Sequence, residues 1–279
     1  MAAPRSLAIT SGKGGVGKSC VALNLAVSIA RHQQRVLLVD ADLGLGNQAI
    51  LQGLSPKRTL EEVLSGLCPI EAAVLEGPEG IVLLPAASQL LPWRPAALTP
   101  AGLAPLRSFE TQFDFVLVDT GAGLAPKVLD FAAAADQLLL LATPEATAIA
   151  DAYALFKILL QRQPALAAGL LVNMAESAQE AAELQEKFAE LAIRFLGAEI
   201  DNWGYIPLDR YVREAAKRQI PFTLATPPPP AARALARLAE KLVEGQPTLA
   251  PQGLFAPLWR QFLSSGSPEQ APYLGGETA

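Results

Sequence analysis

Near the start of the chain, the sequence reads Gly12-Lys13-Gly14-Gly15-Val16-Gly17-Lys18-Ser19. Residues 6–10, directly before it, form an apolar run that predicts a strand, and residues 18–32 carry apolar side chains at helical spacing. The segment satisfies the phosphate-loop pattern G-x-x-x-x-G-K-[ST] in the strand, loop and helix order that this motif requires. Its glycines let backbone N–H groups surround a phosphate at the positive end of a helix, so the sequence predicts nucleotide binding.

Two side chains of this loop carry the expected chemistry. Lys18 supplies a positive charge to the β- and γ-phosphates, and the Ser19 hydroxyl is a ligand for Mg²⁺. We expect the nucleotide to be held by Gly12, Lys13, Gly14, Gly15, Val16, Gly17, Lys18, Ser19 and Cys20.

Short apolar runs alternate with helical patterns along most of the chain. Runs that are apolar at nearly every position are typical of strands covered on both faces, so we expect an α/β fold with a mainly parallel, doubly wound sheet of about seven or eight strands. The predicted strands are residues 6–10, 35–40, 81–84, 113–119, 137–142, 169–173 and 203–206. Between Gln89 and Pro105, four prolines predict a surface crossover without a regular element.

Three aspartates lie at the ends of predicted strands. Asp40 and Asp42 follow one strand, and Asp119 ends another after an apolar run. The carboxyl edge of a parallel sheet is where open α/β folds bind ligands, and an apolar strand that ends in Asp near a phosphate loop is typical of the Walker B arrangement. Asp119 is therefore expected near the Mg²⁺ water shell, while capping of a loop is the alternative role for Asp40 and Asp42.

The composition excludes several other classes of protein. The 279 residues include one histidine and two cysteines, too few for a disulfide framework or a four-ligand zinc site, and a histidine-based catalytic triad is not expected. The net charge of −5 argues against a general electrostatic attraction to nucleic acid. No apolar run reaches the length of about 18 residues needed for a spanning helix, and no secretion signal is apparent, so we expect a cytoplasmic protein.

Lys13 lies five residues before Lys18, which matches the deviant Walker A motif K-G-G-x-G-K-[ST]. Here the sequence resembles the MinD/ParA family of dimerising ATPases, whose architecture is the SIMIBI type of P-loop NTPase. The resemblance covers roughly residues 6–243 and implies that ATP and Mg²⁺ are the cofactors. It also implies an ATP-bound homodimer in which Lys13 reaches the nucleotide of the other subunit, so that slow ATP hydrolysis depends on dimerisation.

The resemblance assigns further roles to single residues. Asp40 would contact the Mg²⁺ shell, and Asp42 would orient or activate the attacking water. The expected metal site is then Ser19, Asp40 and Asp119. The expected catalytic set is Lys13, Lys18 and Asp42.

The same resemblance places the adenine base beside two later segments. Asn173 would hold the base, and the loop that contains Pro207 and Asp209 would pack on it. For Pro207 and Asp209, an ordinary turn is the alternative.

Several segments look most like the FlhG/FleN branch of the family, MinD-like regulators of flagellar number. They are residues 40–47, 119–124, 143–153 and 172–174. This branch implies a switch that regulates flagellar number or placement, with flagellar assembly or regulatory proteins as partners, an FlhF-type GTPase among them. The sequence departs from the family at Ala49, where an aspartate usually follows Asn-Val, and at Ser19, where Thr is commoner.

Two other functions stay open. A ParA-like DNA-partitioning ATPase would use a basic face on DNA phosphates, and the candidates are Arg210, Arg213, Lys217 and Arg218. Without interleaved aromatic residues, a solvated face is favoured and no specific nucleic acid is expected. A metabolic ATP-dependent enzyme on the same fold would need a dedicated charged substrate pocket, which the sequence does not indicate.

The pattern changes towards the C-terminus. We expect an ATPase domain over residues 1–244, followed by a linker, a short amphipathic segment at 254–263 and a disordered tail. Trp259 and other apolar residues of that segment fall on one side of a helical wheel. The favoured interpretation is weak contact with the inner face of the cell membrane, and the alternative is docking on the protein's own domain or on a partner.

Overall fold

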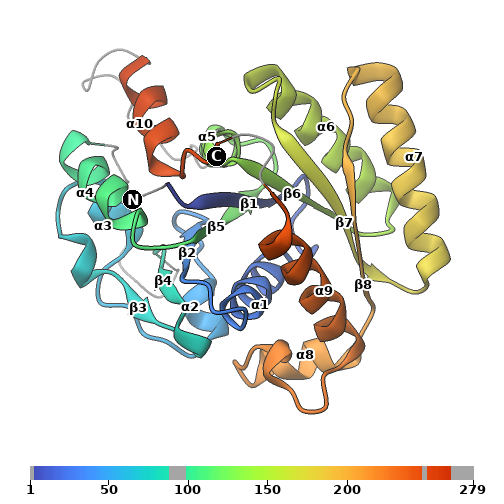
Figure 1. The fold of residues 1–279 in the computed structure, drawn as a ribbon, viewed down its shortest axis with the longest axis horizontal. Coiled ribbons are helices and arrows are strands. Elements are labelled where there is room, and N and C mark those ends of the chain that lie inside the picture. Colours follow the sequence, from blue (N-terminus) through green and yellow to red (C-terminus); the bar gives the residue numbers. More distant parts are fainter. Residues whose placement is uncertain (1–2, 88–98, 247–249, 265–279) are drawn as a thin grey trace, which may run out of the picture.

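The computed structural model describes residues 3–87, 99–246 and 250–264. One sheet runs through the molecule with the strand order β3-β4-β2-β5-β1-β6-β7-β8, and helices lie on both of its faces (Figure 1). All paired strands are parallel except β3, which is antiparallel to β4. The α/β class and the mainly parallel, doubly wound sheet are therefore confirmed.

The strand bounds lie close to the predicted ones. The strands are β1 Arg5–Ser11, β2 Val36–Ala41, β3 Leu75–Glu76, β4 Val82–Leu84, β5 Phe115–Ala122, β6 Gln137–Ala142, β7 Ala167–Ala175 and β8 Asp201–Pro207. The sequence did not predict β3, because two residues at a sheet edge carry no apolar alternation.

Ten α-helices and three short 3₁₀ helices connect the strands within the described ranges. The α-helices are α1 Lys18–Ala30, α2 Gln48–Leu51, α3 Leu60–Leu64, α4 Pro100–Glu110, α5 Pro126–Ala134, α6 Ala146–Arg162, α7 Ala178–Leu196, α8 Arg210–Lys217, α9 Pro230–Glu244 and α10 Phe255–Ser264. The 3₁₀ helices are η1 Ile70–Ala72, η2 Pro78–Gly80 and η3 Phe222–Leu224.

Successive side chains of the central strands pack alternately into two apolar clusters, one on each face of the sheet. Ala8 of β1 packs in the cluster covered by α3 to α7 and α10, whereas its neighbour Ile9 packs in the cluster covered by α1 and α9. This period of two is what a strand buried on both faces requires. The sheet thus holds the carboxyl ends of β1, β2 and β5 at one edge, where the predicted phosphate loop and the aspartates lie.

The prediction that prolines prevent any regular element up to Pro105 is wrong for its last part. The helix α4 begins at Pro100, where a proline costs no hydrogen bond, and the Thr99 side chain accepts a hydrogen bond from Gly102 N at 3.0 Å. Leu103 and Leu106 are fully buried, which stabilises the helix although Pro105 removes one internal hydrogen bond. Residues 88–98 of the expected crossover lie outside the described residues.

The amphipathic C-terminal segment forms α10, which packs against α4 and α5 (Figure 1). Leu254, Phe255 and Leu258 are at most 2% exposed and belong to the same apolar cluster as the sheet. These three described side chains dock on the protein's own domain, which is one of the two expected arrangements, and contact with the membrane stays a prediction. The domain boundary at residue 244 stays a prediction, and the expected tail beyond residue 264 lies outside the described residues.

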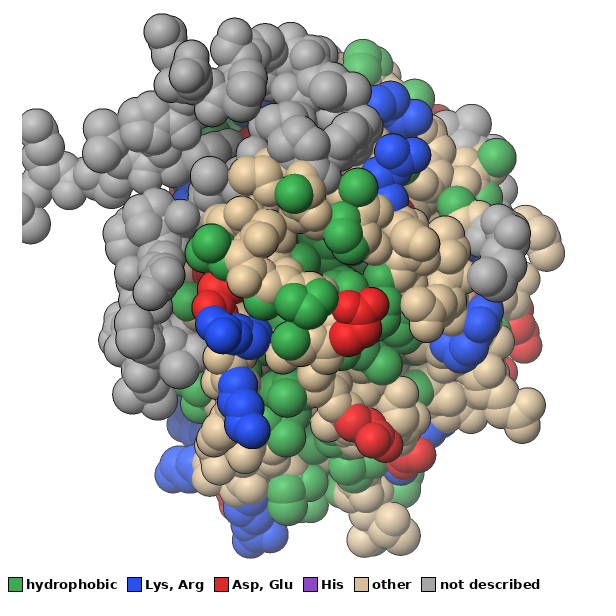
Figure 2. Space-filling view, turned by 90° about the vertical axis from the view of Figure 1, so that its left-hand side faces the viewer, with side chains coloured by type: hydrophobic (Ala, Val, Ile, Leu, Met, Phe, Trp, Pro, Cys, Tyr) green, Lys and Arg blue, Asp and Glu red, His purple; other side chains and the backbone are tan. Residues whose placement is uncertain are grey.

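Two features of the described surface bear on its environment. No helix among the described residues is both long and apolar enough to cross a bilayer. On the face shown in Figure 2, Lys and Arg side chains occur at several separate places among Asp and Glu side chains, with hydrophobic side chains between them. The described residues on that face form no continuous basic surface.

Candidate active site

The loop between β1 and α1 takes the form that a phosphate site needs. Gly15 and Gly17 have φ angles of 80° and 95°, a region that L side chains rarely adopt. A Cβ at Gly12 would lie 2.2 Å from the backbone carbonyl of Asp151, so the loop approaches α6 closely. Beside this loop is a cavity of about 660 Å³, which Gly14, Gly15, Gly17, Lys18, Ser19 and Cys20 help to line.

Lys18 and the half-buried Asp42 meet in this cavity. The Lys18 side chain is buried, and burial lowers the pKa of its ammonium group, an effect that the charges of Asp119 and Asp42 oppose. Burial likewise raises the pKa of Asp42, while Lys18 lowers it. A Cβ at Gly121 would be 2.9 Å from Asp42 Oδ1, so the carboxyl end of β5 lies close to Asp42. The two residues are placed together, as a role in phosphoryl transfer requires.

Asp40 and Asp119 are buried neighbours on paired strands, in register with each other. Burial raises the pKa of Asp119 to about 6, and it raises the pKa of Asp40 well above the usual value, with the charge of Asp119 adding to the effect. Asp119 Oδ2 accepts a hydrogen bond from Gln48 Nε2 at 2.8 Å, and the nearby Ser19 side chain also lowers the pKa of Asp119. The other oxygen, Asp119 Oδ1, is buried without a hydrogen-bond partner.

This arrangement fits Mg²⁺. A buried carboxylate oxygen without a partner, next to the hydroxyl of the phosphate loop, is a pair of hard oxygen donors that a hydrated Mg²⁺ ion would satisfy. Ser19 and Asp119 are therefore the residues that would hold the ion and its water. When bound, Mg²⁺ neutralises charge on the β- and γ-phosphates.

Asp40 accepts backbone hydrogen bonds from the loop that follows β2. Its Oδ1 accepts from Asp42 N at 3.2 Å, and its Oδ2 accepts from Asn47 N at 2.9 Å and Gln48 N at 3.0 Å. The carboxylate thus holds both ends of the loop at residues 42–48, which is the loop-capping alternative. A contact of Asp40 with the Mg²⁺ shell stays a prediction.

Lys13 is not among the residues that line the phosphate cavity. Its Nζ is 2.7 Å from Glu145 Oε2 and 3.3 Å from Thr147 Oγ1, at the start of α6. Both charged side chains are exposed, Lys13 by 41% and Glu145 by 64%. Within one subunit Lys13 therefore does not point at the phosphate position.

The residues predicted for the base line a second cavity of about 200 Å³, together with Gly17 and Cys20. Asn173 Nδ2 donates to Val16 O at 2.8 Å, and this bond joins β7 to the phosphate loop. The side-chain oxygen of Asn173, Oδ1, is left for other contacts. Pro207 and Asp209 lie at the edge of this cavity. Asp209 also caps α8 by accepting from Tyr211 N at 2.9 Å, so it performs the turn role that was the alternative.

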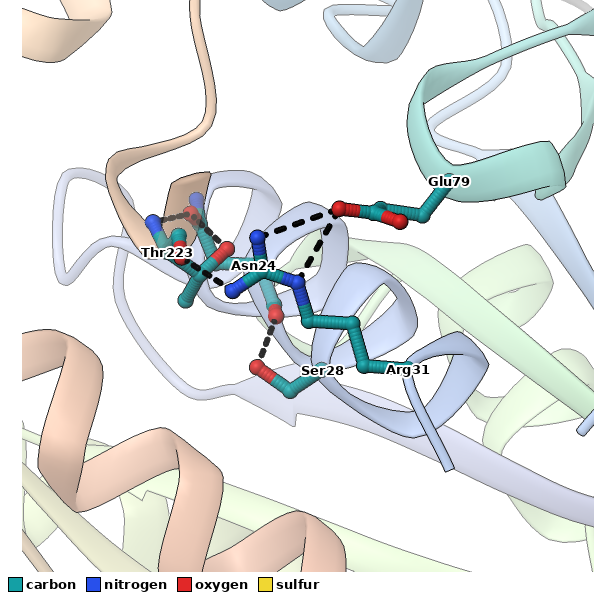
Figure 3. A network of polar contacts seen from close by, with 5 residues as sticks. All are labelled: Asn24, Ser28, Arg31, Glu79 and Thr223. Atoms are coloured by element: carbon teal, nitrogen blue, oxygen red, sulfur yellow. Dashed lines mark hydrogen bonds and ion pairs between the residues drawn. The ribbon is translucent and has the colours of Figure 1, made fainter. Parts of the chain in front are cut away.

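A polar network, buried at Asn24, Ser28 and Thr223, stabilises the wall of the second cavity. Asn24 Oδ1 accepts hydrogen bonds from Thr223 N and Thr223 Oγ1, both at 3.0 Å, and Ser28 Oγ donates to Asn24 O (Figure 3). Arg31 links Thr223 O to Glu79. These contacts tie α1 to η3, whose Phe222 lines the cavity.

Sequence reasoning missed two buried residues of the site. Glu61 of α3 is 2% exposed, and its carboxylate accepts from Gly44 N at 3.0 Å and from Ala87 N at 2.9 Å, so it holds the loop after β2. Gln48 bonds to Asp119 as described above. The nearest signal in the sequence is Ala49, directly after Gln48, where the sequence departs from the family's usual aspartate.

Comparisons with known proteins agree with this geometry. A family model described as ParA, NUBPL iron-transfer P-loop NTPase, matches residues 3–243. The antiactivator FleN of Pseudomonas aeruginosa is 40% identical over 242 residues, 85% of each chain. The chain belongs to the ParA/MinD family.

Two further proteins refine the comparison within the ParA/MinD family. The flagellum site-determining protein YlxH of Helicobacter pylori is 33% identical over 218 residues, 75% of this chain and 72% of that protein. The structure of MinD with Mg-ADP from Pyrococcus horikoshii OT3 has a TM-score of 0.73 and 26% identity, and the match covers 86% of this chain and 96% of that one. This ParA/MinD protein is accordingly a P-loop ATPase of the FlhG/FleN-like branch, and its cofactors are ATP and Mg²⁺.

Proposed function

We propose that the protein is an ATP-dependent dimerising switch with slow, Mg²⁺-dependent hydrolysis that regulates the number or placement of flagella. The flagellar part rests on the likeness to FleN and YlxH. The dimerising part rests on one observation: Lys13, the extra lysine of the phosphate loop, lies outside the phosphate cavity of its own subunit and is exposed.

In this proposal the residues of one subunit bind the nucleotide and those of the other complete the site. The backbone of the phosphate loop and Lys18 hold the phosphates, and Asp42 orients the attacking water. Lys13 of the other subunit would leave Glu145 and bring a positive charge to the charge that develops on the phosphoryl group. Hydrolysis would then require two copies of the chain.

The proposal predicts a specific effect of Lys13→Ala. Loss of a charge that each subunit brings to the nucleotide of the other should lower the turnover of ATP by about 100-fold and abolish the ATP-dependent dimer, while ADP binding is unchanged. An ATP turnover assay measures the first effect. Light scattering with ATP and with ADP measures the dimer. Lys57→Ala, at another exposed lysine, is the matched control and should behave as the wild type. Full turnover of Lys13→Ala would contradict the switch mechanism.

The cellular role has its own test. Deleting the gene in the source organism is expected to change the number of flagella per cell, and the wild-type chain but not Lys18→Ala should restore it. Normal flagellation in the deletion strain would reject the flagellar role without touching the ATPase mechanism.

We expect flagellar assembly or regulatory proteins as partners, with an FlhF-type GTPase as one candidate, and a cytoplasmic location. Weak peripheral contact with the inner face of the cell membrane would require α10 to leave α4 and α5 if it involves Phe255 or Leu258, because these side chains are buried there. Sedimentation with liposomes in ATP and in ADP, with and without residues 246–279, tests this contact.

A further inference from the structure

Gln48, the first residue of α2, has a completely buried side chain between three segments of the site. Its Nε2 donates to Asp119 Oδ2 at 2.8 Å and to Ser19 O at 2.9 Å. Asp119 ends the apolar part of β5, Ser19 lies in the first turn of α1, and Gln48 itself follows the loop after β2. One side-chain amide therefore joins the three segments from which the Mg²⁺ site is built.

The two bonds orient the Asp119 carboxylate. Because Gln48 occupies Oδ2, the partnerless Oδ1 is the oxygen left for Mg²⁺ or its water. A neutral amide orients the carboxylate and leaves its negative charge in place. A lysine at this position would cancel that charge. Hydrogen bonds to a metal-binding carboxylate are known to set both its orientation and the affinity for the ion.

The backbone of Gln48 connects this contact to the loop at residues 42–47. Gln48 N and Asn47 N both donate to Asp40 Oδ2, so the side chain of Gln48 can reach Asp119 only while the end of this loop is in place. The next residue, Ala49, where the family usually has aspartate, packs in the apolar cluster and offers no polar side chain. In this chain the side-chain contact between the loop segment and Asp119 is made by residue 48.

We propose that Gln48 is a positioning residue that turns Asp119 towards Mg²⁺ and makes the affinity for the ion depend on the loop at residues 42–47. The residue acts through Asp119, whose carboxylate accepts a hydrogen bond from its amide. Loss of the amide is expected to weaken Mg²⁺ binding and to leave the binding of the nucleotide itself unchanged.

The test compares ADP binding with and without Mg²⁺, using a fluorescent ADP analogue and the full chain. Gln48→Met keeps the length and the burial of the side chain but removes both donors. In EDTA its affinity for ADP should equal that of the wild type, whereas the Mg²⁺ concentration that half-saturates the tightening of ADP binding should rise by about 10-fold or more. Gln52→Met, one turn further, is the control and should match the wild type, since the Gln52 amide donates to Gln48 O and not to Asp119.

Two results would overturn the proposal. One is an unchanged Mg²⁺ requirement in Gln48→Met, and the other is an equal loss of ADP affinity in EDTA and in Mg²⁺, which would indicate a purely structural role. Should Gln48→Met not fold, Gln48→Asn keeps the amide on a shorter side chain that cannot reach both acceptors, and it should also raise the Mg²⁺ requirement. Wild-type behaviour of the Asn variant would likewise reject the proposal.

Discussion

Gly17 is the residue at which the phosphate loop becomes α1, and its position joins the two cavities of the site. Its φ of 95° lies in the left-handed region, and it lines both the phosphate cavity and the second cavity. A Cβ at this position would be 2.5 Å from Asn173 Nδ2. Asn173 in turn donates to Val16 O, one residue earlier in the same loop.

We predict that Gly17→Ala destabilises the nucleotide-free protein. The left-handed conformation costs a non-glycine residue about 1–2 kcal/mol, and displacing Asn173 removes a hydrogen bond worth about 1 kcal/mol. The free energy of unfolding, measured by urea denaturation, should therefore fall by about 2–3 kcal/mol. Gly14→Ala is the control, since open space surrounds its Cβ, and it should change this free energy little. Equal stability of the two variants would show that the loop relaxes around Gly17.

At the scale of residues, prediction from the sequence worked where the chemistry is local. The phosphate loop gathers its glycines, Lys18 and Ser19 within eight consecutive positions, so their spacing alone indicated the site. Gln48 and Glu61 were missed because their partners are distant in the chain: Gln48 bonds to Asp119, and Glu61 bonds to Ala87. A single Gln or Glu near the start of a helix has many ordinary roles, and only the fold brings these partners together.

At the scale of helices and strands, prediction from the sequence also failed where distant contacts decide the structure. The long parallel strands were predicted because burial on both faces makes them apolar throughout, whereas β3 is too short to show a pattern. The prolines of α4 predicted a loop. The amphipathic pattern of α10 predicted an exposed surface. Contacts between these two helices, which are distant in the sequence, decide both outcomes.

The docking of α10 involves a buried carboxylate whose protonation we expect to matter. Glu110 Oε2 accepts hydrogen bonds from Leu254 N at 2.8 Å and Phe255 N at 3.2 Å. Burial raises the pKa of Glu110 to about 7, the bonds to Leu254 and Phe255 lower it, and the charges of Asp136 and Arg107 act in opposite directions. If undocking exposes Glu110, its pKa returns towards the usual 4.5.

The docked state then binds more protons than the undocked state between about pH 4.5 and pH 7, so docking weakens as the pH rises through this range. The full effect is about 3 kcal/mol, from roughly 1.4 kcal/mol for each pH unit of the shift. Amide hydrogen exchange of residues 254–258, corrected for intrinsic rates, should show less protection at pH 8 than at pH 5.5. In Glu110→Gln, which cannot ionise, protection should not vary with pH, and a variation equal to that of the wild type would assign the effect to another group.

For the whole molecule, the two apolar clusters account for the high hydrophobic content. Hydrophobic residues make up 51% of the chain, and both faces of the sheet are covered by buried side chains from helices. One consequence is that the carboxyl edge of the sheet is the place where polar groups collect. The site therefore arises from the topology, which brings the ends of β1, β2 and β5 side by side.

The distribution of charge across the molecule separates the flagellar switch from a DNA-partitioning ATPase. The net charge is −5, and the hollow that Arg210, Arg213 and Lys217 help to line on α8 also contains Asp209 and Glu214. Acidic side chains within a Debye length of about 8 Å reduce the attraction of such a face for phosphates. We therefore predict an affinity for duplex DNA weaker than about 10⁻⁴ M at physiological salt, with ATP or ADP, in fluorescence anisotropy. Tighter binding that falls with salt and is abolished by the double substitution Arg213→Ala and Lys217→Ala would instead support partitioning, because counterion release from phosphates requires those cations.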